Sequence, residues 1–371
     1  MRLHIATNEK IINRCISNFE EVHPGENKWI VLWGESTKDY VDDRKEVVKC
    51  KYNTTTFWRA VGHVKSYDKI IVHFLTQESA KFVCKITHPC IYWIEWGFDL
   101  YNILLQHKGY QLYSDSRLQK KYSAHNKLGL FFPIYKTVSL SRLQKLYYKA
   151  ALKMKFFVPD SMYDEYPLLL EYYPALKNLQ YKEFFYYPID EVLGSNYEQQ
   201  YCEGQNIIIG NSASLSGNHF EVLDLLKRIG IGNRNIIVPL SYGNKKYGDD
   251  VEDYGRLCFD AKFIGLREYI SLDKYNEILK SGSYFIYNNY RQEAVGNILV
   301  ALYLGGKVFL NTKNPLLKFY KSIGLKIFDF SELCGNDGYT SLSKEDIEHN
   351  RKILVNYYSR ERQLNLIRDN M

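Results

Sequence analysis

Glycine, serine, asparagine and histidine are concentrated in one short stretch of the chain, residues 207–219, with the sequence IIIGNSASLSGNH. An apolar run leads into Gly210, Asn211 and Ser212, and helical spacing begins soon after Ser216. A glycine lets the backbone approach a phosphate closely, and the N–H groups of a helix N-terminus attract anions. The stretch therefore predicts a phosphate site, although Ser216 could equally serve only as a helix N-cap.

A second stretch with this kind of chemistry covers residues 290–314, YRQEAVGNILVALYLGGKVFLNTKN. It places Arg291 and Gln292 at the end of an expected strand and Gly296 in the first turn of an expected helix. An arginine there could clamp a pyrophosphate with two parallel hydrogen bonds. The alternative is a surface arginine and a glycine that only allows close helix packing.

Carboxylates follow an apolar run at residues 95–99, EWGFD. Transfer of a group to a hydroxyl benefits from a base that takes the proton of that hydroxyl. Asp99 and Glu95 are the candidate catalytic residues, with His73 as a reserve candidate. Asp99 could instead cap the helix that follows it.

Two series of strands and helices must position these residues. The first series has apolar runs at 2–6, 29–33, 69–75 and 90–96, which alternate with polar stretches, as in an open parallel α/β sheet. Residues 100–190 look more helical. The second series has expected strands at 206–209, 235–239, 262–266, 284–287 and 307–311, with helices over 219–229, 272–279 and 293–304.

The expected fold class is therefore α/β, with an N-terminal Rossmann-like domain over 1–190 and a C-terminal one over 205–342. A charged helix over 343–371 would pack back on the N-terminal domain. This is the plan of a GT-B glycosyltransferase, with ligands between the domains beyond the carboxyl ends of the strands. Phosphorylases and sugar-nucleotide epimerases share the plan, so architecture alone does not fix the reaction.

Composition excludes several classes. The chain of 371 residues is 46% hydrophobic and 25% charged, which is ordinary globular usage. It lacks an apolar run near the roughly 18 residues needed to span a bilayer, and it starts on a strand-like segment, so no signal peptide is expected. Seven scattered cysteines, never in CxxC spacing, argue against disulfides or structural zinc and favour a cytoplasmic location.

Positive charge is concentrated in residues 108–160, which contain eleven basic and two acidic residues. The formal net charge of the whole chain is +7. Within 139–157, Arg142, Lys145, Lys149 and Lys153 interleave with apolar residues at helical spacing. Such a segment suits the surface of an anionic membrane, and the aromatic stretch 129–135 precedes it. The alternative is a core-facing helix with a solvated basic side.

Five short motifs, in order, make the chain resemble glycosyltransferase family 56, which contains TDP-N-acetylfucosamine:lipid II N-acetylfucosaminyltransferases. They are WGFDLY at 96–101, GNSxxxSxxH at 210–219, VPLSYG at 238–243, RQxxxGN at 291–297 and LNxxNP at 310–315. The resemblance implies transfer of a deoxy-amino sugar from a TDP- or UDP-sugar to a polyprenyl-diphosphate-linked saccharide. It also implies work at the cytoplasmic face of the inner membrane, in O-antigen or common antigen synthesis.

The resemblance assigns roles to individual residues. Gly210, Asn211, Ser212, Ser216 and His219 then belong to the donor diphosphate site. Tyr242 would lie over the nucleotide, and Arg291, Gln292, Gly296 and Asn297 would contact the phosphates or the donor sugar. Asn311 and Asn314 join the donor site or are structural turn residues.

No strict D-x-D triplet occurs, and Asp249, Asp250 and Asp253 look like a solvated acidic loop. A GT-B enzyme can neutralise the leaving diphosphate with arginine, helix dipoles and backbone N–H groups, so no cofactor and no essential metal are expected. Two other functions stay open. One is a GT-B sugar-nucleotide epimerase, which has no evident need for the basic segment. The other is a non-catalytic protein that binds membranes or nucleic acid. For the favoured glycosyltransferase function, no nucleic-acid partner is expected.

Overall fold

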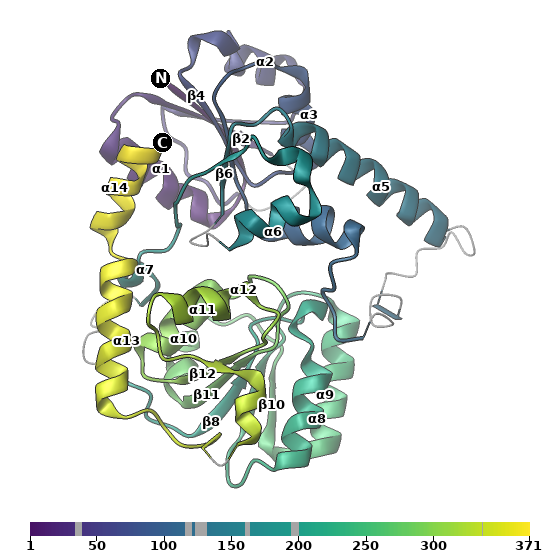
Figure 1. The fold of residues 1–371 in the computed structure, drawn as a ribbon, viewed down its shortest axis with the longest axis vertical. Helices are drawn as coiled ribbons and strands as arrows, with labels where there is room; N and C mark the ends of the chain where they lie inside the picture. Colours follow the sequence, from purple (N-terminus) through teal and green to yellow (C-terminus); the bar gives the residue numbers. More distant parts are fainter. Residues whose placement is uncertain (34–38, 116–120, 123–131, 160–163, 194–199, 336) are drawn as a thin grey trace. The chain divides into compact units, whose positions relative to one another are not determined.

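The computed structural model describes residues 1–371 except 34–38, 116–120, 123–131, 160–163, 194–199 and 336; for 132–139 and 272–273 it describes the backbone alone (Figure 1). The chain divides into two compact units. Unit 1 contains Met1–Tyr110, Lys127–Tyr186 and Arg360–Met371, and unit 2 contains Gln111–Asn126 and Tyr187–Ser359.

Unit 1 is built on a seven-stranded parallel sheet in the order β3-β2-β1-β4-β5-β6-β7. Its strands are β1 (Arg2–Thr7), β2 (Asn27–Leu32), β3 (Val47–Cys50), β4 (Lys69–His73), β5 (Ile91–Ile94), β6 (Phe156–Val158) and β7 (Gln180–Tyr181). The central strands are apolar on both faces, and Ile70, Ile71 and Val72 are fully buried. Parallel strands read as continuous apolar runs because helices cover both faces of the sheet.

The helices of unit 1 pack in pairs around this sheet. They are α1 (Lys10–Val22), α2 (Thr55–Val61), α3 (Gln77–Lys85), α5 (Phe132–Ala151), α6 (Glu165–Tyr172) and α14 (Arg360–Asn370), with a π-helical segment η2 (Phe98–Leu105). Helix α1 packs against α14, and α5 packs against both α3 and η2. The start of α3 is fixed by a capping box between Thr76 and Ser79.

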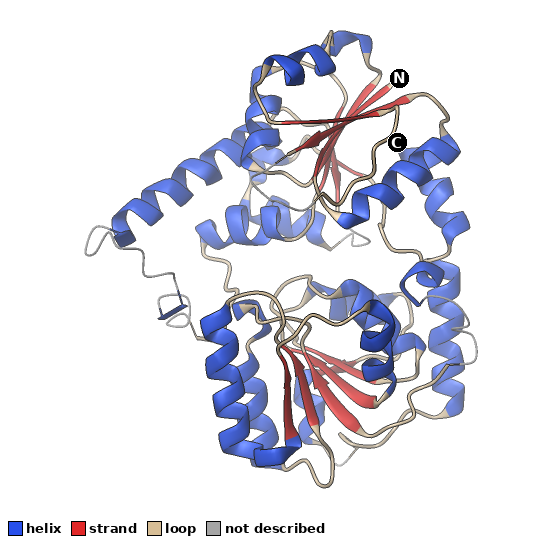
Figure 2. Cartoon of the chain, turned by 180° about the vertical axis from the view of Figure 1, so that it is seen from behind, coloured by secondary structure: helices blue, strands red, loops and turns tan. Residues whose placement is uncertain are grey.

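Unit 2 has a six-stranded parallel sheet in the order β10-β9-β8-β11-β12-β13 (Figure 2). Its strands are β8 (Asn206–Ile209), β9 (Ile236–Pro239), β10 (Phe263–Leu266), β11 (Gly282–Tyr287), β12 (Lys307–Leu310) and β13 (Phe328–Asp329). Its helices are α7 (Ile189–Leu193), α8 (His219–Ile229), α9 (Lys245–Phe259), α10 (Leu272–Lys280), α11 (Val295–Tyr303), α12 (Pro315–Ser322) and α13 (Lys344–Tyr357). Buried Ile207, Ile286 and Phe309 form its core together with Val222 and Leu226 of α8.

Several expected elements differ in the structure. Strands β3, β6 and β7 were not expected, and the last two lie in the region read as helical. Asp249, Asp250 and Asp253 lie on helix α9 and not in a loop. The expected C-terminal helix is two helices, because α13 ends at Tyr357 and α14 starts at Arg360.

The first domain boundary also differs from the expected one, because residues 111–126 cluster with unit 2. The backbone N–H of Ser114 donates to Asn218 Oδ1 at 2.8 Å, and the Tyr122 hydroxyl donates to Asp250 Oδ2 at 2.7 Å. The Tyr122 ring packs edge-on against Tyr247 in the hydrophobic core of unit 2. These contacts tie the segment to α8 and α9.

Candidate functional site

The strand order of unit 2 has a switch point between β8 and β11. From β8 the chain moves to β9 and β10 on one side, and then returns to β11 and β12 on the other side. Loops that leave the carboxyl ends of strands at such a point diverge and leave room for a ligand. The two loops here are the turn 210–212 after β8 and the segment 288–293 after β11. Sequence reasoning singled out both, and they belong to one edge of one sheet.

Gly210 begins the turn after β8 with φ +64°, in the left-handed region that favours glycine. A Cβ atom at this position would lie 2.9 Å from His219 Nε2, so the histidine ring fills the space that a side chain would need. His219 is the first residue of α8 and is buried. Two features therefore require glycine at position 210: the left-handed backbone conformation and the closeness of the His219 ring.

The buried His219 is neutral and has one ring nitrogen without a partner. Burial lowers the pKa of His219 to about 4. The Tyr247 hydroxyl lies 3.0 Å from His219 Nδ1 and accepts the backbone N–H of the same residue at 3.1 Å. If that hydroxyl donates to Nδ1, the ring proton lies on Nε2. His219 Nε2 has no hydrogen-bond partner among the described residues.

Glu293 is the centre of a polar network that joins the two loops. Its Oε2 accepts from Ser216 Oγ at 2.5 Å and from Asn289 Nδ2 at 2.9 Å, and it lies 3.1 Å from Arg291 Nη2. The Arg291 Nη1 group donates to the Gln292 carbonyl at 3.0 Å. Arg291 Nε is buried and lacks a partner within the described part of the chain. The arginine is thus fixed on one side and has one donor unused.

A second network lies beside the first and was not found from the sequence. Asn288 donates to Glu221 Oε2 at 2.7 Å and accepts from Asn311 Nδ2 at 2.7 Å. Asn218, with φ +48° and no exposed surface, donates to the Asn288 carbonyl at 2.9 Å. The run NNYRQE at 288–293, directly after an apolar strand, is the sequence signal that could have drawn attention to Asn288 and Glu293.

The other predicted donor residues occupy varied places at this edge. Asn211 Nδ2 donates to the Tyr242 hydroxyl at 3.0 Å, and Tyr242 is 61% exposed. Ser212 and Gln292 are buried, and Asn297 donates to the Tyr275 hydroxyl at 3.0 Å.

Two further predicted residues have structural explanations, and a third, Gly296, does not. Asn311 accepts the backbone N–H of Lys313, and Asn314 caps helix α12 through the N–H of Leu316. These are the turn and cap roles that formed the structural alternative. A Cβ atom on Gly296 would meet Val192 at an ordinary 3.6 Å, so close packing within the chain does not require glycine there.

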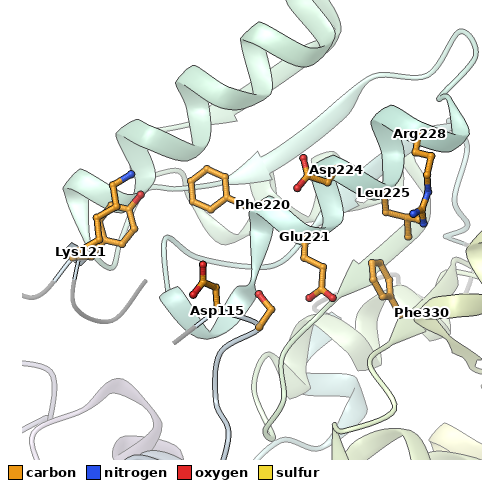
Figure 3. A pocket seen from close by; sticks show the side chains of 10 residues that line it. Asp115, Lys121, Phe220, Glu221, Asp224, Leu225, Arg228 and Phe330 are labelled. Carbon is orange, nitrogen blue, oxygen red and sulfur yellow. The ribbon is translucent and has the colours of Figure 1, made fainter. Parts of the chain in front are cut away.

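Unit 2 also carries a pocket of about 620 Å³ on the outer side of α8 (Figure 3). None of the predicted donor residues lines it. Its walls combine aromatic, acidic and basic side chains, and the lining is Ser114, Asp115, Lys121, Tyr122, Phe220, Glu221, Asp224, Leu225, Arg228 and Phe330. Glu221 belongs both to this pocket and to the network around Asn288, so the pocket adjoins the strand-end site.

Asp99, in unit 1, is fully buried and its carboxylate is saturated with hydrogen bonds. It accepts from Leu75 N at 2.9 Å, from Trp93 Nε1 at 2.7 Å and from Trp96 N at 2.9 Å. Burial raises the pKa of Asp99, and these three hydrogen bonds oppose that rise. The carboxylate therefore joins the loops after β4 and β5, and its role as a base stays a prediction.

Glu95 is also fully buried, and it faces a second buried carboxyl group. Its Oε2 accepts from Gly97 N at 2.6 Å. Burial, followed by the nearby Glu165 and then Asp99, raises the pKa of Glu95 well above its usual range. His73 is buried as well, with Nε2 3.0 Å from His4 Nδ1 and Nδ1 2.8 Å from the Tyr186 hydroxyl. Burial lowers the pKa of His73 to about 3, which makes it a poor base.

The basic helix α5 has an exposed and a buried side. Arg142, Lys145 and Lys149 are exposed, whereas Tyr147 and Ala150 are buried on the side that packs against α3 and η2. Lys153 is not available to a membrane in the same way, because Nζ donates to the carbonyls of Cys84 at 2.8 Å and Ile86 at 2.5 Å.

Tyr147 and Ala150 of α5 therefore face the core, as in the alternative interpretation, whereas Leu140 is exposed. In the predicted aromatic stretch, 129–131 lie outside the described residues, and the structure places only the backbone of 132–135.

Within the residues that the structure describes, no three His, Cys, Asp or Glu side chains gather as a metal site would require. The described helices are also too short or too polar for any of them to cross a membrane.

Residues 168–333 match the family model described as 4-alpha-L-fucosyltransferase glycosyl transferase group 56. That range contains the strand-end networks of unit 2.

Among solved structures, sucrose-phosphate synthase from Thermosynechococcus elongatus has a TM-score of 0.61 at 8% identity, covering 98% of this chain and 97% of that one. An α,α-trehalose-phosphate synthase (UDP-forming) from Burkholderia xenovorans, in complex with glucose-6-phosphate, has a TM-score of 0.59 at 9% identity, with 100% and 98% covered. The lipopolysaccharide glycosyltransferase WaaG has a TM-score of 0.50 at 10% identity, with 99% and 94% covered.

These structures share the GT-B fold, as the two parallel sheets of this chain do. The chain thus has the GT-B fold, and its residues 168–333 are similar to glycosyltransferase group 56.

Proposed function

We propose that this glycosyltransferase moves a deoxy-amino sugar from a TDP- or UDP-sugar to a polyprenyl-diphosphate-linked saccharide in the synthesis of a bacterial surface polysaccharide. The match to group 56 supports a nucleotide-sugar donor and a separate acceptor. The motif resemblance supports the lipid-linked acceptor and the kind of sugar.

The observation that carries the donor site is the setting of Arg291. Glu293 and the Gln292 carbonyl hold its guanidinium, and Nε lies unused at the switch point of the unit 2 sheet. A diphosphate accepts charge-assisted hydrogen bonds from such a group. The negative charge of the leaving diphosphate is then stabilised by a fixed cation, which lowers the barrier to transfer.

Two helix N-termini reinforce this site. Helices α8 and α11 follow β8 and β11 in the chain, and the N-cap residue of neither helix makes a side-chain cap, although the first N–H of α8 donates to the Tyr247 hydroxyl. Their positive ends favour anions. Because arginine and helix ends already supply positive charge, we propose that the reaction proceeds without an essential metal.

For the acceptor proton, we propose Asp99 as the base. Burial raises the pKa of Asp99, which moves a carboxylate toward the pH at which a base is most effective. Burial and the neighbouring carboxyl groups raise the pKa of Glu95 well above its usual range, which favours its protonated form and makes it the weaker candidate for the base. The acceptor hydroxyl must come within hydrogen-bond distance of Asp99, so one of the loops that donate to it has to move when acceptor binds.

We further propose a peripheral location on the cytoplasmic face of the inner membrane. Arg142, Lys145 and Lys149 on α5 supply an exposed basic side that suits anionic head groups. An enzyme with a polyprenyl-linked acceptor must reach that surface.

The donor site is tested by calorimetric titration with UDP and TDP. Arg291→Ala should weaken binding of either nucleotide by about 1.5–3 kcal/mol, the range for a charge-assisted hydrogen bond, whereas uridine and thymidine should bind as before. Arg228→Ala is the matched control, because Arg228 is an exposed arginine of the same unit that lines the pocket beside α8. If Arg228→Ala weakens binding and Arg291→Ala does not, the diphosphate occupies the pocket and the proposed donor site is wrong.

A further inference from the structure

Three aromatic side chains gather at the carboxyl ends of β4 and β5 in unit 1. The rings of Phe74 and Trp96 stack with centroids 5.1 Å apart and an interplanar angle of 9°. Phe98 meets Phe74 edge-on at 6.5 Å and is 48% exposed. We call these three residues the aromatic platform. Proteins usually bury large aromatic side chains, so an exposed one beside a stacked pair suggests a binding surface.

The backbone at Phe74 is held in a conformation that phenylalanine rarely adopts. Its φ is +68°, in the left-handed region where a side chain costs free energy. Its N–H donates to the Ile94 carbonyl at 2.9 Å, and its own carbonyl accepts from Thr76 N at 3.0 Å. Glycine would fit this backbone without strain. Strained residues are retained mainly where their side chains have a function, so the position of the Phe74 ring is itself informative.

The charge around the platform limits what can bind there. Residues 73–76 (HFLT) and 94–99 (IEWGFD) contain no lysine or arginine, and they contain the two carboxyl groups Glu95 and Asp99. A phosphate in this place would gain no cation from either loop, and the only charged side-chain types in the two loops are the buried carboxyl groups. A nucleotide or a diphosphate is therefore disfavoured, and an uncharged ring is favoured.

We propose that the aromatic platform binds a pyranose ring of the acceptor saccharide. The C–H groups on one face of a sugar carry partial positive charge and pack against the negative face of an aromatic ring. The indole N–H of Trp96 is buried without a partner in the described part of the chain, and a sugar hydroxyl would supply the missing acceptor. This inference rests on the proposed function, and it names the site of the acceptor in that reaction.

The test uses saturation-transfer NMR on the full chain with methyl glycosides of glucose, galactose, N-acetylglucosamine and N-acetylmannosamine. Protons on the ring face of at least one glycoside should receive saturation from the wild type. Phe98→Ala and Phe74→Gly should each weaken that binding by about tenfold, as expected for one lost aromatic contact. Phe98→Trp should retain it, because it restores an aromatic face.

Leu152→Ala provides the matched control, because Leu152 is a 50% exposed apolar residue of unit 1 outside the platform. It should leave glycoside binding unchanged. Hexanol tests for a purely apolar site, and binding of hexanol in place of every glycoside would overturn the proposal in favour of a lipid contact. Unchanged glycoside binding in both Phe98→Ala and Phe74→Gly would overturn it too.

UDP titration of the same samples separates this proposal from the donor site. If the wild type binds UDP but no glycoside, the platform proposal is wrong and the donor proposal stands. If glycosides bind through Phe98 and UDP does not bind, the platform proposal stands and the donor site is wrong.

Discussion

The carboxyl edges of the two sheets have the same strand plan, but Arg291 and His219 of unit 2 differ from Asp99 of unit 1 in how far the chain satisfies their hydrogen bonds. In unit 2, Arg291 Nε and His219 Nε2 are buried without partners in the described chain, beside the glycine turn at 210. In unit 1, the oxygens of Asp99 accept from three donors of the chain itself. A polar group that the protein already satisfies maintains structure, whereas an unsatisfied one is available to a ligand. The comparison teaches that burial and strand-end position do not by themselves identify a catalytic residue.

The largest loss of stability should follow from removing the hydrogen-bonded carboxylate of Asp99 in unit 1. Asp99→Ala leaves the backbone N–H groups of Leu75 and Trp96 and the indole of Trp93 without an acceptor, so the free energy of unfolding should fall by about 3 kcal/mol or more. Asp249→Ala is the control, because Asp249 is half-exposed and its ion pair with Arg267 should contribute less than about 1 kcal/mol. Urea unfolding of the two variants measures both values.

Asp99→Asn separates structure from catalysis at the same position. A folded Asp99→Asn protein that binds UDP normally but turns over about 10²–10⁴-fold more slowly would support the proposed base. Near-normal turnover would leave Asp99 with a structural role alone.

A smaller loss of stability should follow from replacing Gly210, in the turn after β8 of unit 2, by alanine. Gly210→Ala places a Cβ atom 2.9 Å from His219 Nε2 and also strains a backbone with φ +64°. Gly25→Ala is the matched control, because Gly25 has φ +71° and nothing within 4 Å of the added atom. The control should lose about 1–2 kcal/mol of stability from backbone strain alone. Gly210→Ala should lose more and should also weaken UDP binding; equal losses and normal UDP affinity would remove the turn from the donor site.

Lowering the pH should reduce the free energy of unfolding, because the folded chain contains buried histidines whose pKa values are lowered. Burial lowers the pKa of His73 to about 3, that of His219 to about 4 and that of His4 well below its usual value. Between about pH 4 and 6.5 the unfolded chain binds protons that the folded chain does not. Each such histidine therefore lowers the free energy of unfolding by about 1.4 kcal/mol for each pH unit below 6.5. Buried Glu95, with its raised pKa, acts in the opposite direction because the folded form keeps its proton.

Denaturant titrations at pH 7 and pH 5.5 measure this dependence. His73→Gln and His219→Gln should each reduce the loss of stability between these pH values by about one histidine's share. A wild-type protein equally stable at both pH values would contradict the buried, neutral state of these rings.

The smallest effect per residue should come from reversing the charge of the exposed basic residues of α5, and it should be seen in membrane binding. Each lysine or arginine near an anionic bilayer contributes about 1 kcal/mol to binding, and salt screens it. Replacing Arg142, Lys145 and Lys149 by Glu should release the protein from phosphatidylglycerol vesicles at low salt and leave UDP binding intact. Lys153 is left unchanged because it ties down the carbonyls of Cys84 and Ile86. A wild type that ignores such vesicles would contradict the membrane proposal.

The sequence predicts the central strands well because each is an apolar run bounded by polar turns. Strands β6 and β7 were missed because they have three and two residues, too few for a pattern. Helix α9 was read as a loop because Gly248 and Gly255 and three aspartates obscure its apolar side, where Tyr247 and Val251 are buried one turn apart. In each case packing against the rest of the unit decides the element, and local sequence does not report it.

The residues of the candidate site were likewise predicted only in part. Gly210 and Arg291 were found because they come soon after apolar runs, and Ser216 because helical spacing begins after it; the edge of a parallel sheet brings such positions together. Glu293 and Asn288 were missed because their importance comes from partners 77 and 67 residues away in the chain, Ser216 and Glu221. No spacing rule connects residues so distant. The three hydrogen bonds to Asp99 also escaped sequence reasoning, because the path of the chain after β4 and β5 brings Leu75, Trp93 and Trp96 to its carboxylate.

The return of residues 360–371 to unit 1 has a consequence for the order in which the protein forms on the ribosome. Helix α14 supplies buried Ile367 and Met371 to unit 1, Gln363 donates to the Phe185 carbonyl at 2.7 Å, and Arg2 Nε donates to the Met371 carbonyl at 2.8 Å. All of Tyr187–Ser359 is synthesised before this helix. At about 5–20 residues per second, unit 1 must wait roughly 10–35 s with the α14 side of α1 uncovered. During that interval the unfinished unit would be a natural client for a chaperone, even though most of its sheet has already left the ribosome.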